Sequence, residues 1–167
     1  MAMIWTQNMS VGIKQFDDDH KKLIRYANEL QDAIHYPPAQ GAVDPVEIEV
    51  ILHRMENYAR WHFMGEEAAM SKTGFPGLEE HRGEHLKFIA NVAEMTQRCL
   101  GSSDPRHAAQ IAEFLHNWII DHVYMMDGKY VDYLHDHAME WCNPSEITGT
   151  LRREAKAENS KEQVPGS

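Results

Sequence analysis

Two pairs of potential metal ligands, each spaced four residues apart, constrain this chain more than any other feature. His62 and Glu66 form the first pair, and His81 and His85 form the second. Residues four apart lie on the same face of a helix, about one turn from each other. A turn rich in glycine and proline, residues 73–77, separates the pairs, so we expect them on consecutive helices. The pattern predicts a metal site inside a helical bundle.

Apolar residues recur at helical spacing along most of the chain, in four segments separated by helix start and stop signals. Asp44-Pro45 and Asp104-Pro105 each place a capping aspartate before a proline, a typical first residue of a helix. Long helices with short connections favour an all-α, up-down-up-down four-helix bundle. The predicted helices begin near residues 17, 44, 78 and 104 and end near residues 37, 72, 101 and 128, and a shorter segment at 129–137 continues the fourth.

Segments of different character flank the predicted helices. Residues 1–16 carry scattered apolar side chains such as Val11, which predicts an extended arm packed against the bundle. The three aspartates at 17–19 are expected to cap the first helix and to place negative charge in its first turn. We expect arm and bundle to form one domain, residues 1–142. Residues 143–167 are polar and charged, which predicts a flexible tail.

The charge balance bears on partners and location. The chain has 26 acidic and 16 basic residues, for a formal net charge of -10, which argues against nucleic acid and anionic membranes as partners. No apolar run is long enough to span a bilayer, and the first segment is too short and polar for a signal peptide. Cys99 and Cys142 are isolated and are expected to be free thiols. We therefore expect a cytoplasmic protein, and a monomer is favoured.

The predicted topology brings seven potential ligands to one end of the bundle. The first and third helices begin where the second and fourth end, so at about 1.5 Å per residue all seven fall within a few turns of that end. His122 and Asp127 are five apart, which turns them about 140° from each other in an α-helix. Both reach one site if the helix loosens into a π-type bulge or ends near Asp127. The seven are His20, His62, Glu66, His81, His85, His122 and Asp127.

Five histidines and two carboxylates exceed the ligand set of one tetrahedral zinc ion, which is about four. Two metal ions with bridging carboxylates fit better, and nitrogen with oxygen ligands suits iron. Binding of a single zinc ion would overturn this assignment. Glu67 and Glu84 either orient imidazoles from outside the site or lie on solvated helix faces, and the second interpretation is favoured.

The pattern as a whole resembles one known family, the hemerythrins, and specifically the single-domain bacterial members. The resemblance covers about residues 3–135 and includes all seven potential ligands, so no single pair carries it. The matching residues are Trp5, Val11-Gly12-Ile13, Phe16-Asp17-Asp18-Asp19-His20-Lys21-Lys22-Leu23, His62-Phe63, Glu66-Glu67, His81, His85, Trp118-Ile119, His122, Asp127 and Tyr130.

The resemblance implies an asymmetric centre of two iron ions (Fe2+/Fe3+), bridged by two carboxylates and an oxo or hydroxo group. One iron would keep an open position for dioxygen, inside an apolar pocket that excludes water. Ile119 stands where a leucine is more usual in the family, so access to that pocket is expected to differ. By family position, His81, His85 and His122 would hold one iron, His20 and His62 the other, Glu66 and Asp127 would bridge them, and Leu23, Phe63, Trp118, Ile119 and Val123 would line the pocket.

The function implied by the resemblance is reversible dioxygen binding, for storage, transport or delivery to an oxygen-using enzyme, and not catalysis. Two other classes stay open: an oxygen sensor acting through a partner, and an enzyme that converts peroxide or nitric oxide at the same irons. Iron storage is a less favoured hypothesis, because closed histidine-rich sites retain iron rather than pass it on.

Overall fold

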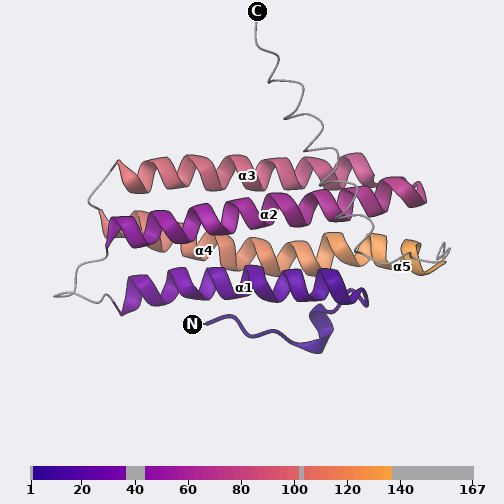
Figure 1. The fold of residues 1–167 in the computed structure, drawn as a ribbon, viewed down its shortest axis with the longest axis horizontal. Coiled ribbons are helices and arrows are strands. Elements are labelled where there is room, and N and C mark those ends of the chain that lie inside the picture. The colour runs from indigo at the N-terminus through magenta and orange to yellow at the C-terminus, as the bar shows by residue number, and fades with distance from the viewer. Residues whose placement is uncertain (1, 37–43, 102–103, 137–167) are drawn as a thin grey trace, which may run out of the picture.

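Four long helices lie side by side in the computed structural model, which describes residues 2–36, 44–101 and 104–136. The elements are a short 3-10 turn, η1 (Gln7–Met9), the helices α1 (Lys14–His35), α2 (Pro45–Thr73), α3 (Leu78–Leu100) and α4 (Pro105–His122), a π-helical turn, η2 (Val123–Asp127), and α5 (Gly128–Asp136). Each long helix runs antiparallel to the next, and α1 and α3 both contact α2 and α4 (Figure 1). The described residues contain no strand. The predicted all-α, up-down-up-down bundle is confirmed.

Local sequence signals set the boundaries of α2 and the start of α4. Asp44 and Asp104 each accept a hydrogen bond on Oδ1 from the backbone N–H two residues later, at 2.8 and 3.0 Å. The proline after each aspartate has no N–H to leave unpaired in the first turn. α2 ends at Gly74, whose φ of 72° lies in the left-handed region that favours glycine. These boundaries agree with the sequence prediction to within a residue.

The predicted start of the first helix was wrong. α1 begins at Lys14, so residues 17–19 lie inside the helix and the arm is shorter than predicted. Asp17 instead ties the arm to the helix, because its carboxylate accepts hydrogen bonds from the Val11 N–H at 2.8 Å and the Ser10 hydroxyl at 2.6 Å. An aspartate in the first turn can thus satisfy the preceding loop without being the capping residue.

The N-terminal arm packs against α1, as predicted (Figure 1). Met3, Met9 and Val11 are buried. Asn28 on α1 holds the backbone of Met3 with two hydrogen bonds, donating from Nδ2 to the carbonyl at 2.9 Å and accepting on Oδ1 from the N–H at 2.8 Å. Apolar burial and backbone pairing together fix the arm.

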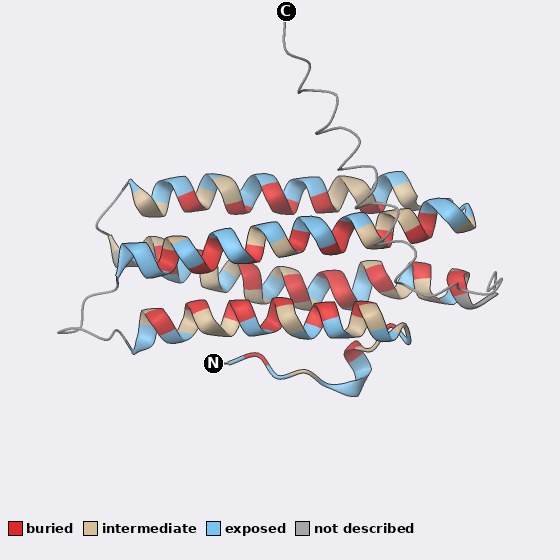
Figure 2. Ribbon diagram, in the orientation of Figure 1, coloured by how far each residue is buried: buried red, intermediate tan, exposed pale blue. Residues whose placement is uncertain are grey.

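Most buried side chains face the interior between the four long helices (Figure 2). A second apolar cluster forms at the end of the bundle where α1 begins and α2 ends. It joins the arm, α1, α2 and α5, so that end is covered on several sides by apolar groups. Its members are Val11, Phe16, Ala69, Met70, Tyr130 and Leu134.

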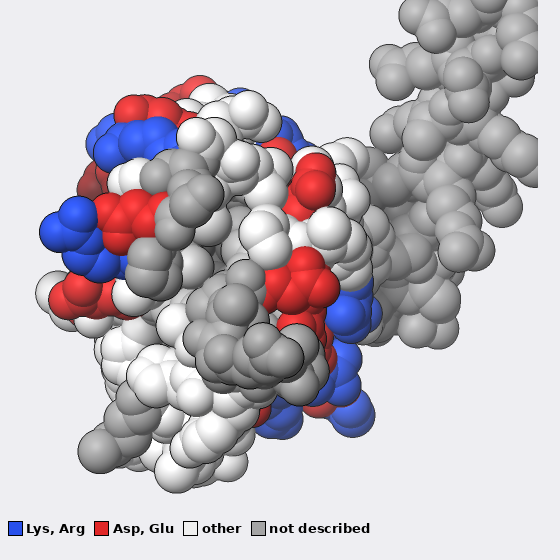
Figure 3. Space-filling view, turned by 90° about the vertical axis from the view of Figure 1, so that its left-hand side faces the viewer, with Lys and Arg blue, Asp and Glu red and all other residues white. Residues whose placement is uncertain are grey.

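Charged side chains occupy the outside of the bundle. In the view toward the end where α1 finishes and α4 starts, acidic and basic side chains lie beside each other (Figure 3). Asp104 and Arg106 make such a pair, 2.6 Å apart. No helix in the described ranges is long and apolar enough to cross a membrane. The predicted boundary at residue 142 and the tail, residues 143–167, lie outside the described residues.

Candidate metal centre

Every long helix contributes to one buried cluster of histidines and carboxylates. The cluster lies toward the end of the bundle where α1 and α3 begin, because the antiparallel order brings the later parts of α2 and α4 to the same place. Each member is at most 5% exposed. The contributors are His20 from α1, His62 and Glu66 from α2, His81 and His85 from α3, His122 from α4 and Asp127 from η2.

The π-helical turn brings His122 and Asp127 to the same side of their helix. In an α-helix, residues five apart point about 140° away from each other. A π turn closes its hydrogen bonds five residues apart and so accommodates one extra residue. His122 Nε2 consequently lies 3.3 Å from Asp127 Oδ1. Of the two arrangements left open by the sequence, the structure contains the π turn, and the chain continues as α5.

Glu66 lies between two groups of histidines, with one oxygen facing each group. Its Oε1 is 3.5 Å from the Nε2 atoms of both His20 and His62. Its Oε2 is 3.4 Å from His85 Nε2 and 3.7 Å from His81 Nε2. We call His20 and His62 the two-histidine side of the cluster.

Asp127 repeats this arrangement. Its Oδ2 lies 3.2 Å from His20 Nε2, and its Oδ1 lies 3.4 Å from His81 Nε2 and 3.3 Å from His122 Nε2. His122 joins His81 and His85 in what we call the three-histidine side. Each carboxylate therefore faces both sides of the cluster.

Ligand atoms without hydrogen-bond partners show that the cluster suits metal ions. Buried polar atoms normally have such partners, yet among the described residues Nε2 of His20 and of His81, Oε2 of Glu66 and both carboxylate oxygens of Asp127 have none. Two ligands bound to one ion at about 2.0–2.2 Å lie about 3–3.5 Å apart, close to the nitrogen–oxygen distances of 3.2–3.7 Å observed. The residues present fit two metal ions that share two carboxylates.

Both carboxylates stay ionised despite complete burial. Burial opposes ionisation of Glu66, but His62 and the other imidazoles hold its pKa well below the ordinary value. Burial and the Glu66 charge oppose ionisation of Asp127 as well, yet His122 and His20 hold its pKa at about 2. Burial lowers the pKa of His20, but Asp127 and Glu66 outweigh burial and raise it to about 10. The paired carboxylates thus require positive charge, from a protonated imidazole or from metal ions.

Tyr130 was part of the sequence pattern without a role, and the structure places its phenol on Glu66. The hydroxyl donates to Glu66 Oε1 at 2.6 Å, and both residues are fully buried. Burial and the nearby carboxylates raise the pKa of Tyr130 well above its ordinary value, so the phenol stays protonated and remains a donor. This bond fixes the orientation of the central carboxylate.

Two further carboxylates contact ligand imidazoles from outside the cluster. Glu67 Oε1 lies 2.9 Å from His85 Nδ1, and Glu67 Oε2 accepts a hydrogen bond from Arg82 Nε at 3.0 Å. The favoured prediction of a solvated face for Glu67 was therefore wrong, because His85 turns its second nitrogen toward α2. Asp19 lies behind His62. The Glu-Glu dipeptide is the sequence signal for Glu67, whereas Asp19 belongs to the aspartate run predicted to start the first helix.

The five residues predicted to line an oxygen pocket are buried or half-buried, and two of them touch ligand imidazoles. Phe63 stacks on His85 with ring centroids 3.8 Å apart and planes 7° apart. Trp118 stacks on His122 at 4.1 Å and 14°. Both rings thus lie against the three-histidine side, and a dioxygen pocket stays a prediction. The five are Leu23, Phe63, Trp118, Ile119 and Val123.

The chain is similar to proteins described as hemerythrins. The family model of the hemerythrin HHE cation binding domain matches residues 11–134. The chain is 25% identical over 154 residues to a bacteriohemerythrin of Stenotrophomonas maltophilia, covering 92% of this chain and 95% of the relative. It is 26% identical over 129 residues to a bacteriohemerythrin of Clostridium acetobutylicum, covering 77% and 98%. It is 27% identical over 127 residues to a myohemerythrin of Riftia pachyptila, covering 76% and 89%.

Solved structures agree with the sequence relatives. The bundle superposes on a crystal structure of wild-type hemerythrin with a TM-score of 0.68 at 23% identity, covering 79% of this chain and 97% of that one. A leucine-to-alanine mutant of hemerythrin gives the same TM-score and coverage at 25% identity. The family match spans the four long helices and all seven members of the buried cluster, and on this ground the chain belongs to the hemerythrin family.

Proposed function

We propose that this protein binds dioxygen reversibly at a centre of two iron ions, for oxygen storage, transport or delivery to oxygen-using enzymes. One observation supports the proposal most: Glu66 and Asp127 each turn one oxygen to the two-histidine side and one to the three-histidine side. Shared carboxylates with histidine on both sides suit two ions better than one. Two iron ions held there would supply the electrons with which dioxygen is bound and released.

The residues of this chain would then have three roles: binding the ions, orienting Glu66 and excluding water. The three-histidine side would hold one ion fully, and the two-histidine side would hold the other with fewer protein ligands, which leaves room for dioxygen. Tyr130 would keep Glu66 in its bridging orientation. Buried aliphatic side chains, Leu23, Ile119 and Val123, would exclude water, which otherwise promotes irreversible oxidation of the irons.

The direct test is to load the protein with ferrous iron without oxygen, admit oxygen, and then remove it while recording the visible spectrum. We expect two irons per chain and a charge-transfer band that appears with oxygen and disappears without it. Irreversible oxidation on first exposure would contradict the proposal. Turnover of added peroxide or nitric oxide would favour the enzyme instead, and binding of one zinc ion per chain in place of two irons would overturn the two-metal centre.

Two histidines of α2 provide a matched pair of variants. His62→Ala removes a member of the two-histidine side, and the protein is expected to retain one iron and lose the reversible band. His53→Ala removes a histidine that is exposed on the same helix and lies 3.7 Å from Glu49. That variant is expected to bind iron and oxygen as the unchanged protein does.

We also propose that the protein acts as a cytoplasmic monomer. The net charge of -10 supports the monomer, because like-charged copies repel one another. Sedimentation at several concentrations and salt levels would measure the mass of the particle. A dimer that persists at micromolar concentration would contradict the monomer.

A further inference from the structure

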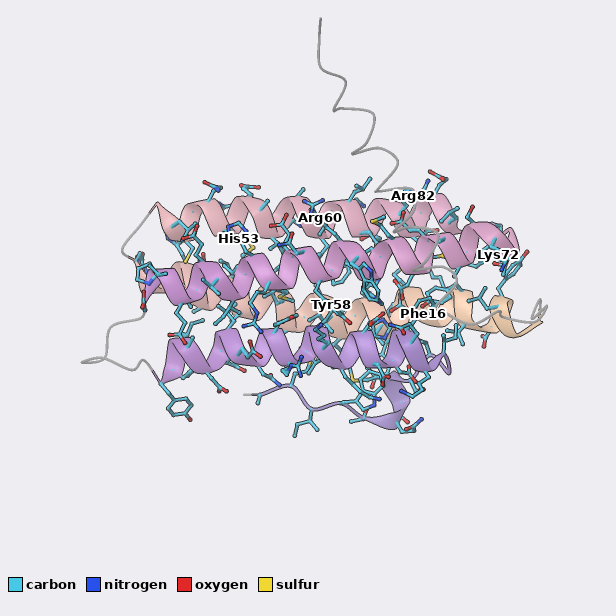
Figure 4. All side chains as sticks on the ribbon, in the orientation of Figure 1. Phe16, His53, Tyr58, Arg60, Lys72 and Arg82 are labelled. Atoms are coloured by element: carbon cyan, nitrogen blue, oxygen red, sulfur yellow. The ribbon has the colours of Figure 1, made fainter. Side chains whose placement is uncertain are left out.

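Tyr58 links the surface of the bundle to the two-histidine side of the cluster. It stands one helical turn before His62 on α2, so both side chains lie on the same helix face. Tyr58 occupies the space between α2 and α1 (Figure 4). Its hydroxyl donates a hydrogen bond of 2.5 Å to Oδ1 of Asp19 on α1.

Asp19 is a buried carboxylate whose neighbours hold it in place. Besides the Tyr58 hydroxyl, Nε2 of Gln15 lies 3.0 Å from its Oδ1 and 3.2 Å from its Oδ2. A buried carboxylate needs such donors, because leaving one without them is costly. Oδ2 also faces Nδ1 of His62 at 3.5 Å, and this nitrogen has no hydrogen-bond partner among the described residues. Asp19 therefore offers an acceptor to the outer nitrogen of His62.

The three-histidine side contains a comparable arrangement. Glu67 lies 2.9 Å from Nδ1 of His85 and is itself held by Arg82 at 3.0 Å. One imidazole on each side of the cluster is thus backed by a carboxylate that further side chains hold. Arg82 holds the carboxylate on one side, and Tyr58 together with Gln15 holds it on the other. Such outer partners fix which ring nitrogen is protonated and how the ring is oriented.

Packing fixes the phenol ring of Tyr58 as well. Nζ of Lys22 lies 3.9 Å from its centroid, a cation–π distance. The rings of Tyr26 and Trp61 lie 5.9 and 5.6 Å away. A ring held by a cation and two aromatic neighbours has little freedom to turn its hydroxyl from Asp19.

We propose that Tyr58 is a positioning residue for the metal centre: through Asp19 it holds His62 with the proton on Nδ1 and the Nε2 lone pair directed into the cluster. This inference rests on the proposed two-metal centre. Removing the Tyr58 hydroxyl leaves Asp19 with the flexible Gln15 side chain as its remaining donor among the described residues. The carboxylate can then shift, and the His62 ring loses its fixed orientation. Metal should consequently be lost faster from the two-histidine side, while the three-histidine side, backed by Glu67, keeps its ion.

The test uses Zn²⁺ alone, which takes the same nitrogen and oxygen ligands and gives sharp NMR spectra. Zinc-loaded protein is mixed with excess chelator, and release is followed in time. We expect two release phases, the faster one from the two-histidine side. In Tyr58→Phe this faster phase should accelerate about tenfold, the lower end of the effect of losing an outer partner, and the slower phase should stay unchanged. Long-range nitrogen–proton NMR of labelled histidine should show His62 protonated on Nδ1 in the unchanged protein and a mixture of tautomers in the variant.

Two variants make the test specific. Tyr26→Phe removes the hydroxyl of the neighbouring ring and should release zinc as the unchanged protein does. Asp19→Asn should accelerate the same phase, and adding Tyr58→Phe to it should change little further, because both act through one carboxylate.

Equal release from Tyr58→Phe and Tyr26→Phe, acceleration of both phases alike, or full additivity with Asp19→Asn would each overturn the inference. A protein that holds two zinc ions, shows the expected phases and yet fails to cycle oxygen with iron would leave Tyr58 in this role and remove the oxygen-binding function instead.

Discussion

Replacing Tyr130 by phenylalanine tests how the central carboxylate is held. The change deletes one oxygen from a fully buried ring and leaves no large cavity, because the ring itself is retained. It removes the 2.6 Å hydrogen bond to Glu66 Oε1. A hydrogen bond to a charged group contributes about 1.5–3 kcal/mol, and Glu66 keeps imidazoles 3.4–3.7 Å away after the change. We therefore expect a loss of about 2 kcal/mol.

Urea unfolding of the metal-free protein measures this loss. With a slope of about 2 kcal/mol per M, a loss of about 2 kcal/mol lowers the midpoint by about 1 M. Tyr124→Phe is the control, because that hydroxyl is exposed and makes just one long contact among the described residues, 3.5 Å from the Thr6 hydroxyl. The control should stay within about 0.5 kcal/mol of the unchanged protein. Chelator competition should also show metal affinity about 10–100-fold weaker in Tyr130→Phe.

Equal unfolding midpoints for Tyr130→Phe and Tyr124→Phe would refute the energetic reasoning. A lower midpoint with unchanged metal affinity would refute the role of Tyr130 in metal binding. In that case Tyr130 would stabilise the fold without orienting Glu66 toward metal.

Three other changes follow from the structure. Deleting exposed Met125 from the five-residue π turn should restore α-helical geometry and leave His122 and Asp127 four residues apart on one helix face, so metal analysis should still find two ions per chain while circular dichroism stays helical, and loss of an ion would contradict this account of the turn. Leu115→Ala, in the core, should cost about 2–5 kcal/mol in urea unfolding and leave the metal content of the folded protein unchanged. Arg106 holds the pKa of Asp104 at about 2, below its ordinary 3.8, so this carboxylate stabilises the fold above about pH 4 and ceases to do so as the pH falls toward 2. The stability advantage of the unchanged protein over Asp104→Asn should disappear across that interval in thermal unfolding, and a constant difference would contradict the assignment.

The amino-acid sequence by itself determined the helices and their order. The Asp-Pro pairs at residues 44 and 104 and the glycine at residue 74 act within one helical turn of the chain, so their effect can be read locally. Ligand pairs four apart, such as His62 and Glu66, share a helix face for the same local reason. Antiparallel order then brings all such pairs to one end of the bundle.

Only the tertiary structure decided features that depend on contacts between separate segments of the chain. The local sequence predicts Asp17 as a helix cap, yet Asp17 lies inside α1 and binds the N–H of Val11 in the arm. The local sequence predicts Glu67 as a surface residue, yet Glu67 contacts His85, eighteen positions later.

The π turn and the Tyr58–Asp19 contact show the same limit. The spacing of His122 and Asp127 allowed two helix geometries, and the structure contains one of them. Tyr58 and Asp19 are 39 positions apart and meet only when α1 and α2 pack at one rotation about their axes. Helix periodicity sets which residues share a face, but the rotation of each helix against its neighbours, set by the packing of the whole core, decides which faces meet.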